Sequence, residues 1–261
     1  MKTIISRDGT SIAYDTLGNG KPLILIDGAL CYRSFGPMPK LAPLLAKYFT
    51  VYFYDRRGRG DSTDKKPYAV DREVEDIEAL IKNAGGSAFV FGISSGAVLA
   101  MKGAQAGLNI PKLAMYEPPY VYEKQNGSVP PNHEANLKSL LANNRRGDAV
   151  KYFMVKMVGA PAVFGFIMSL LPVWKKLKAV AHTLPFDAAI MGDFTVPVAE
   201  IYSVKTPTLV AGGEKSPAAL RTAVQSTADA LPNGNLRWLE GQTHNVNVDA
   251  LAPVLIEYFT T

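Results

Sequence analysis

Residues 89–100, FVFGISSGAVLA, place two serines between two glycines directly after an apolar run. The preceding segment SAFVFG has the length and composition of a short buried strand, and the following segment SSGAVLAMKGAQAG those of a helix. A Gly-x-Ser-x-Gly pattern at a strand-to-helix turn presents its serine on a strained backbone, and the flanking glycines keep the space around it open. Ser94 is therefore a candidate nucleophile, and Ser95 begins the predicted helix.

Strands and helices alternate on both sides of this turn. TIISRD and SIAYDTLG have the alternating pattern of half-exposed antiparallel strands. PLILID and TVYFYD are continuous apolar runs separated by a helical segment at 36–47, which is the pattern of a parallel crossover. The strands SAFVFG, KLAMYEPP, TPTLVAGG and NLRWLE follow, separated by helices, and ALAPVLIEYFT forms a last helix. The sequence predicts an α/β fold with a mostly parallel sheet of eight strands, flanked by helices.

A helical insertion interrupts this alternation. Residues 119–203 contain the helix-like segments EANLKSLLANN, DAVKYFMVKMV, AVFGFIMSLL and VWKKLKAVAHTL, and no convincing strand. We therefore predict a core of residues 1–118 and 204–261 that carries residues 119–203 as a lid. We expect the large apolar side chains of the insertion to pack it onto the core, and some of them to line a pocket: Phe153, Met154, Met157, Phe164, Phe166, Met168 and Trp174.

Composition excludes several classes of protein. A chain of 261 residues, 48% of them hydrophobic, is long enough for one large core. Its single cysteine and its three histidines do not fall into a metal-ligand spacing, so we predict no metal or other cofactor: Cys31, His133, His182 and His244. The net charge of +5 comes from scattered lysines and arginines without a recognition motif, which argues against a nucleic-acid partner. The arginine-rich stretch YDRRGRGDS lacks a phosphate-loop pattern, and we expect a structural role for it.

Neither end of the chain nor its interior suggests a membrane protein. The N-terminal residues have no apolar core of a signal peptide. The longest apolar stretch, GAPAVFGFIMSLLPVW, contains two prolines and is shorter than the roughly 20 residues that cross a bilayer. We predict a cytoplasmic protein that acts on a small molecule, and leave open whether it is a monomer or a homodimer.

The chain resembles the α/β-hydrolase fold family over essentially its whole length. Six stretches carry the resemblance and follow one another in the family's order: LILIDGAL, VYFYDRRGRGDS, FVFGISSGA, LAMYEPP, PTLVAGGEKSP and LEGQTHNV. The resemblance implies a helical cap inserted after the sixth strand, Ser94 as nucleophile and His244 as its base. It also implies an oxyanion hole formed by the backbone N–H groups of Ala29 and Ser95. Asp27 stands where the family usually has a histidine before this loop. Because the oxyanion-hole donors are backbone groups, this substitution does not by itself remove them, but a charged carboxylate nearby would disfavour the oxyanion.

The acid of the triad is where the sequence departs from the family pattern. The usual aspartate, three residues after Gly213, is replaced by Ser216. Glu214 lies in the same loop at a different offset, and Glu117 ends the sixth predicted strand, where some branches of the family, certain haloalkane dehalogenases among them, carry their acid. We expect Glu117, because the chain order serine, acid, histidine is kept. Glu214 is the alternative, and a site without any acid would be a weak enzyme.

These residues predict a serine hydrolase that cleaves a carboxylic ester of a small, largely apolar substrate through an acyl-enzyme. A serine at the nucleophile position argues against the dehalogenase and epoxide hydrolase branches, which use aspartate there. Amide, lactone, thioester or carbon–carbon cleavage would use the same triad. The alternatives are a lyase or perhydrolase with the same pocket, and a non-hydrolytic ligand receptor or partner-dependent signalling protein, which the altered acid position and Asp27 would favour.

Overall fold

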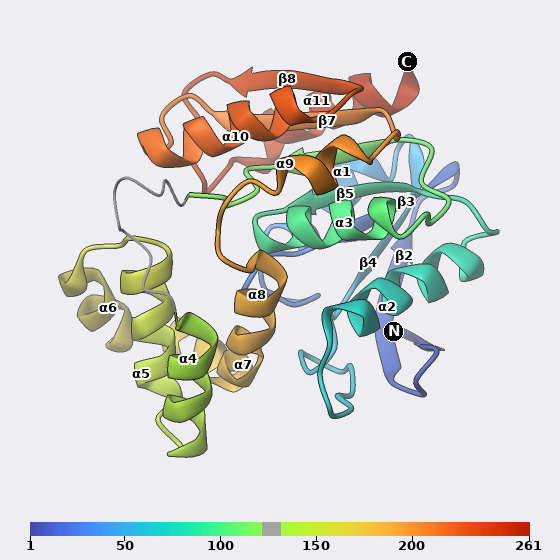
Figure 1. Ribbon diagram of the computed structural model, residues 1–261. Helices are drawn as coiled ribbons and strands as arrows, with labels where there is room; N and C mark the ends of the chain where they lie inside the picture. The colour runs from blue at the N-terminus through green and yellow to red at the C-terminus, as the bar shows by residue number, and fades with distance from the viewer. Residues whose placement is uncertain (122–131) are drawn as a thin grey trace.

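Figure 1 shows the computed structural model of the chain, which describes residues 1–121 and 132–261. Its sheet has eight strands in the order β1-β2-β4-β3-β5-β6-β7-β8. The strands β1 and β2 are antiparallel to their neighbours, and β3 to β8 are parallel. The mostly parallel sheet predicted from the sequence is thus confirmed. The strand bounds are Lys2–Ile5, Ser11–Leu17, Lys21–Ile26, Phe49–Tyr54, Phe89–Ile93, Leu113–Tyr116, Thr208–Gly213 and Gly234–Leu239.

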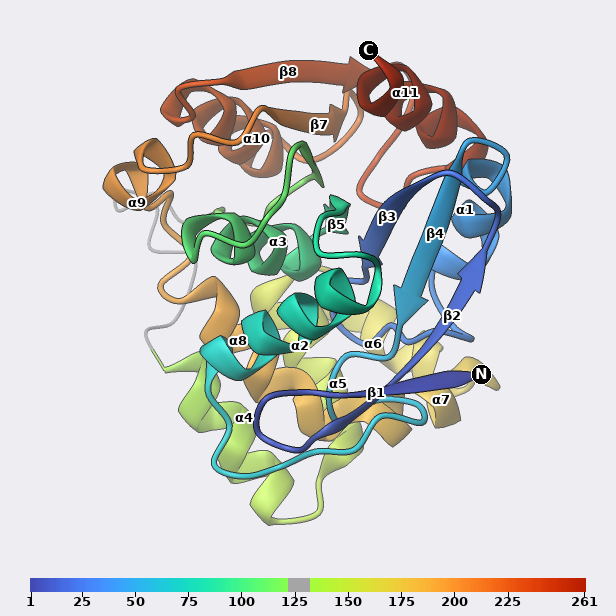
Figure 2. The same ribbon diagram turned by 90° about the vertical axis from the view of Figure 1, so that its right-hand side faces the viewer.

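Helices cover both faces of the sheet (Figure 2). On one face lie α1 (Met38–Leu45) and α11 (Val248–Thr260), and on the other α2 (Val70–Asn83), α3 (Ser95–Gln105) and α10 (Ala218–Ala230). Alternate side chains of the central strand β5 enter different cores: Phe89, Phe91 and Ile93 pack towards α1 and α11, and Val90 towards α2 and α3. Burial on both faces explains why the parallel strands are continuous apolar runs.

The chain between β6 and β7 is helical, as the sequence predicts (Figure 1). Residues 122–131 of the predicted insertion lie outside the described residues, as does the side chain of Phe164. The insertion has its own apolar core, which includes Leu137, Phe153 and Trp174. No helix in the described ranges has the length and apolar character needed to span a membrane. The helices are α4 (His133–Ala142), α5 (Arg146–Tyr152), a π-helical turn (Phe153–Met157), α6 (Ala162–Ser169), α7 (Val173–Val180), α8 (Leu184–Met191) and α9 (Val198–Tyr202).

The end of the insertion differs from the sequence prediction. The predicted helix VWKKLKAVAHTL is α7 only as far as Val180, and a 3-10 turn (Ala181–Thr183) then leads into α8, which the sequence does not reveal as a separate helix. Pro185 lies in the first turn of α8. Proline lacks a backbone N–H, so it starts a helix more readily than it continues one. The break at Thr183 lets α8 turn back and pack against α3.

A buried ion cluster joins α8 to the core. Asp187 of α8 is fully buried and pairs with Arg56 at 2.8 Å and with Arg59 at 2.7 Å, both from the loop after β4. Arg56 also pairs with Glu73 of α2 at 2.7 Å. Although burial alone would raise it, the guanidinium groups of Arg59 and Arg56 hold the pKa of Asp187 below its ordinary value. The insertion is therefore fastened to the sheet by charge as well as by apolar contact.

Arg57, the third buried arginine of this loop, joins the loop to α2 and to the segment after β1. It pairs with Asp76 of α2 at 2.7 Å and with Asp8 at 2.9 Å, and it donates to the carbonyl of Arg72. The structural role expected for YDRRGRGDS agrees with these contacts. The carboxylate partners on α2 lie within about twenty residues of the loop, whereas Asp187 on α8 is 131 residues from Arg56.

We predict that Asp187→Asn destabilises the fold strongly, because Arg59 loses its only carboxylate partner among the described residues. Breaking a buried ion pair on one side costs about 3–5 kcal/mol. Lys138→Met, which removes an exposed i,i+4 pair with Glu134, serves as the control and is expected to cost less than about 1 kcal/mol. Urea denaturation of both variants measures the difference, and equal losses would contradict the assigned role of the cluster.

Candidate active site

Ser94 occupies a strained turn between β5 and α3. Its backbone has φ 56° and ψ −128°, in a region that residues with a side chain rarely adopt. A Cβ on Gly92 would lie 2.3 Å from the carbonyl oxygen of Gly96, and a Cβ on Gly96 would lie 2.5 Å from that of Asp27. Both positions therefore require glycine. The Ser94 N–H donates to the carbonyl of Tyr116 at 2.9 Å, which ties the turn to β6.

Glu117 and His244 meet beside this turn. Glu117 follows β6 and is completely buried, and its Oε2 lies 2.8 Å from Nδ1 of His244. A carboxylate on Nδ1 fixes the ring and leaves Nε2 for a nucleophile. Ser94 and His244 line one cavity, although no hydrogen bond joins these two described residues. In sites without bound substrate such hydrogen bonds are often long.

The other oxygen of Glu117 is held by the loop after β7. Oε1 accepts hydrogen bonds from the N–H of Gly213 at 2.7 Å and from Oγ of Ser216 at 2.5 Å. Ser216 occupies the position where the family pattern has its acid, and here its hydroxyl donates to Glu117. The backbone of Glu117 has φ 48°, a strained conformation that is often found at functional sites.

Glu214, the alternative acid, does not reach His244. Its side chain is exposed and lines a separate surface depression with Arg221 and Trp238. The structure thus brings together Ser94, Glu117 and His244 and leaves Glu214 outside. The sequence singled out the missing acid at position 216, but it did not reveal that Ser216 contacts Glu117.

The loop after β3 lies against the nucleophile. A Cβ on Gly28 would be 3.1 Å from Cβ of Ser94, so the backbone passes directly beside the turn. Within the described residues neither the Ala29 N–H nor the Ser95 N–H donates to an acceptor. Arg59 fastens the loop through the carbonyls of Gly28 at 2.6 Å and Cys31 at 3.1 Å. Two free N–H groups on a fixed backbone are what an oxyanion hole needs.

Asp27 is buried behind this loop. Only 2% of its surface is exposed, and neither side-chain oxygen accepts a well-aligned hydrogen bond from the described part of the chain. Burial raises the pKa of Asp27 to about 8, against the opposing effect of Arg59 and Arg56. At pH 7 the side chain is therefore mostly neutral, which removes the electrostatic objection to an oxyanion hole beside it.

The cavity at Ser94 and His244 has a volume of about 530 Å³. Its wall is largely apolar and comes mainly from the insertion and from α10 with the residue before it. Of the apolar insertion residues singled out in the sequence, Phe153 and Met157 line it, whereas Trp174 packs in the core of the insertion and Phe166 is exposed. The remaining lining residues are Pro119, Val121, Val155, Lys156, Val158, Gly159, Met191, Phe194, Pro217, Ala219 and Leu220.

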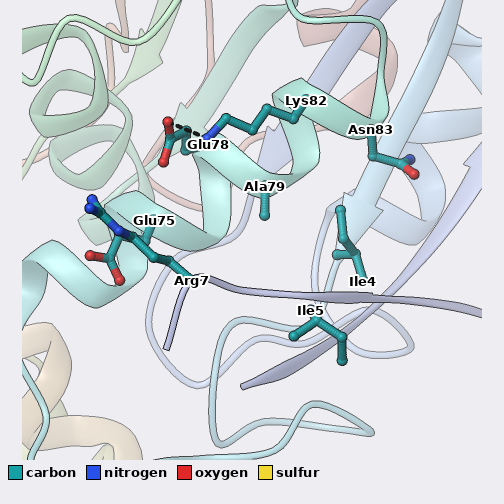
Figure 3. A pocket seen from close by; sticks show the side chains of 8 residues that line it. All are labelled: Ile4, Ile5, Arg7, Glu75, Glu78, Ala79, Lys82 and Asn83. Carbon is teal, nitrogen blue, oxygen red and sulfur yellow. Dashed lines mark ion pairs between the residues drawn. The ribbon is translucent and has the colours of Figure 1, made fainter. Parts of the chain in front are cut away.

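A second hollow, of about 660 Å³, lies between β1 and α2 and holds neither Ser94 nor His244 (Figure 3). Glu78 and Lys82 on its wall pair with each other at 2.6 Å.

Nowhere in the described ranges do three or more His, Cys, Asp or Glu side chains converge so that they could hold a metal ion. Reactive side chains and an apolar wall come together in the cavity at Ser94.

We predict that Asp27→Asn changes how stability depends on pH. In the unfolded chain the carboxyl loses its proton near its ordinary pKa of 3.8, whereas in the folded chain it keeps the proton up to about pH 8. Between these values the folded state binds more protons, so the free energy of unfolding of the wild type falls as pH rises. Relative to wild type, Asp27→Asn gains stability from pH 5 to 8, on the order of a few kcal/mol.

Urea denaturation at several pH values measures this dependence. Asp71→Asn, at an exposed position, is the control and keeps the wild-type profile. If Asp27→Asn also kept that profile, a buried neutral Asp27 would be ruled out.

Comparison with known proteins places the chain in a family. Residues 18–255 match the sequence model of the Alpha/beta hydrolase family. A crystal structure of an alpha/beta hydrolase from Sphaerobacter thermophilus DSM 20745 is 51% identical, with a TM-score of 0.93 over 99% of this chain and 100% of that one. A comparison with proteins of curated function gives no match.

More distant structures share the fold. The enol-lactonase from Burkholderia xenovorans LB400 is 18% identical, with a TM-score of 0.72 over the full length of both chains. A thermophilic esterase from Thermogutta terrifontis, solved with malate bound, is 17% identical, with a TM-score of 0.72 over 99% of this chain and 97% of that one. The family match, the 51% identical structure and the geometry at Ser94 lead to one conclusion: the chain belongs to the alpha/beta hydrolase family.

Proposed function

We propose that the chain is a serine hydrolase that cleaves a carboxylic ester of a small, largely apolar substrate. The observation that carries the proposal is the 2.8 Å contact between Glu117 and His244, beside a serine held in a strained turn. A carboxylate that orients a histidine, and a histidine in the same cavity as a serine, are the groups that acyl transfer requires.

The reaction runs in two steps. Ser94 Oγ attacks the ester carbonyl while His244 Nε2 takes its proton, and the N–H groups of Ala29 and Ser95 stabilise the oxyanion. The intermediate collapses to an acyl-enzyme, and His244 gives the proton to the departing alcohol. Water then attacks the acyl group with His244 as base, releasing the acid and regenerating the serine.

Glu117 acts on His244 rather than on the substrate. Its Oε2 contacts Nδ1, and it stabilises the imidazolium that forms when Nε2 takes the serine proton. Two donors on Oε1, Gly213 N–H and Ser216 Oγ, keep the carboxylate in place. Two observations support hydrolysis over a non-hydrolytic receptor. Glu117 contacts His244 despite the altered acid position, and burial raises the pKa of Asp27, which favours its neutral form.

The size and the lining of the cavity support the proposal of a small, largely apolar substrate. A volume of about 530 Å³ with a mostly apolar wall matches the usual size and lining of a small-molecule site. We propose that residues 119–203 act as a cap over the core formed by residues 1–118 and 204–261. The names of two distant structures, an esterase and an enol-lactonase, agree with acyl chemistry on this fold.

Several expectations stay predictions from the sequence. These are a cytoplasmic location, the lack of a cofactor, a small molecule as the sole partner without nucleic acid or membrane, and the choice between monomer and homodimer. A lyase or perhydrolase with the same residues stays the alternative reaction.

We predict that the protein hydrolyses p-nitrophenyl esters of short and medium acyl chains and that Ser94→Ala abolishes this activity. The release of p-nitrophenol measures both. Ser216→Ala is a matched control that removes another hydroxyl near the site; it is expected to leave measurable turnover, because Gly213 N–H still binds Glu117. Wild type without activity on any ester, or Ser94→Ala with full activity, would contradict the proposed function.

We predict that Glu117→Gln lowers kcat by about three to four orders of magnitude, because the amide disfavours the ring tautomer and cannot stabilise the imidazolium. Glu214→Gln, at the exposed alternative position, is expected to keep kcat within about twofold. Steady-state kinetics of the two variants on one ester provide the comparison. The reverse ranking would assign the acid to Glu214.

A further inference from the structure

The active-site cavity has one unexplained charge. Among the described residues that line it, Lys156 is the only lysine, arginine, aspartate or glutamate, and the proposed mechanism gives it no role. Apart from His244, the other described residues of the wall are apolar or carry a hydroxyl, and none of these described residues is a carboxylate. The side chain of Lys156 is exposed and forms no ion pair with any residue in the described ranges. A lysine without an ion-pair partner among the described residues therefore lines the cavity.

The backbone holds Lys156 at this wall. Phe153–Met157 form a π-helical turn, and the N–H of Val158 donates to the carbonyl of Phe153, five residues earlier, at 3.0 Å. The residues 155–159 all line the cavity, so the widened turn and the chain after it present a continuous strip to the site. Single π-helical turns are rare and occur frequently at functional sites.

Two other lysines of the insertion have partners of their own. The ammonium of Lys138 pairs with Glu134 at 2.5 Å, and that of Lys151 lies 5.9 Å from the centre of the Trp174 ring. Lys156 has no such partner among the described residues and lies among the largely apolar residues that line the cavity. An anion bound at the cavity wall would partly exclude water from the ammonium, and the lower effective dielectric constant would strengthen their attraction.

We propose that Lys156 binds a carboxylate at the end of the substrate remote from the scissile bond. This inference rests on the proposed function and specifies its substrate class: acyl compounds with a free acid group, such as monoesters of short dicarboxylic acids. The scissile carbonyl lies at Ser94, the methylene spacer packs on Phe153, Val155 and Met157, and the carboxylate pairs with the ammonium. The charged hydrogen bond selects the acid over a neutral analogue of the same length.

Two matched esters test the proposal. The p-nitrophenyl ester of pentanoic acid and the p-nitrophenyl monoester of glutaric acid have acyl chains of the same length and differ by one terminal carboxylate. Lys156→Met removes the charge and keeps an apolar side chain of similar length. We expect it to lower kcat/KM about tenfold for the glutarate ester and less than about twofold for the pentanoate ester.

Three comparisons exclude general effects. Lys156→Arg keeps the charge and is expected to restore most of the activity on the glutarate ester. Lys175→Met removes an exposed charge from α7, away from the cavity, and is expected to change neither ester. About 0.5 M NaCl is expected to reduce the wild-type preference for the glutarate ester, because salt screens an exposed ion pair. If Lys156→Met affected both esters equally, or neither, the proposal would be wrong.

A binding measurement separates this inference from the proposed function. Ser94→Ala cannot form an acyl-enzyme, so monoethyl glutarate and ethyl pentanoate bind to it without turnover. Ligand-observed NMR is expected to show that the glutarate monoester binds Ser94→Ala about tenfold more tightly than it binds Ser94→Ala/Lys156→Met, with no difference for ethyl pentanoate. This result would support the anion site even if no ester were hydrolysed, whereas equal glutarate binding by both variants would overturn it.

Discussion

The buried carboxylate of Asp187 is the constraint on which the arrangement of the site depends. It is shared by Arg56 and Arg59, and it accepts a hydrogen bond from Oγ of Ser95 at 2.8 Å. Arg59 in turn holds the carbonyl of Gly28. One carboxylate from the insertion thus joins the loop after β4, the first residue of α3 and the loop beside Ser94. Buried ion pairs are a weak source of stability but can select one arrangement over others. Here they fix the two backbone segments whose N–H groups would form the oxyanion hole.

In the proposed site the acid comes from the end of β6 and not from the loop after β7. Glu117 reaches His244 from β6, and the loop after β7, where the family pattern has its acid, supplies Gly213 and Ser216 as donors to the carboxylate. Because β6 and β7 are neighbouring parallel strands, their carboxyl ends meet at the same edge of the sheet. A carboxylate from either end can therefore face the same histidine, and the spare position is free to become a donor.

Much of this could be predicted from the sequence, because the decisive signals are local. Continuous apolar runs marked the parallel strands, and the glycines around Ser94 marked a turn in which the structure leaves no room for a Cβ. The partners of the buried arginines could not be predicted, since Asp187 is more than a hundred residues from Arg56 and lies in an apolar segment. The protonation state of Asp27 could not be predicted from the sequence either, because burial in the folded chain raises its pKa. Nothing in the sequence distinguished Lys156 from a surface lysine; its place on the cavity wall follows from the π-helical turn.

The central claim is that Ser94 is a nucleophile activated by His244, and covalent labelling tests it most directly. The wild-type protein is treated with a fluorophosphonate, which reacts with activated serines, and the adduct is located by mass spectrometry of peptides. The account predicts one adduct per chain, on Ser94. An adduct on another serine such as Ser95, or no adduct after prolonged treatment, would contradict it.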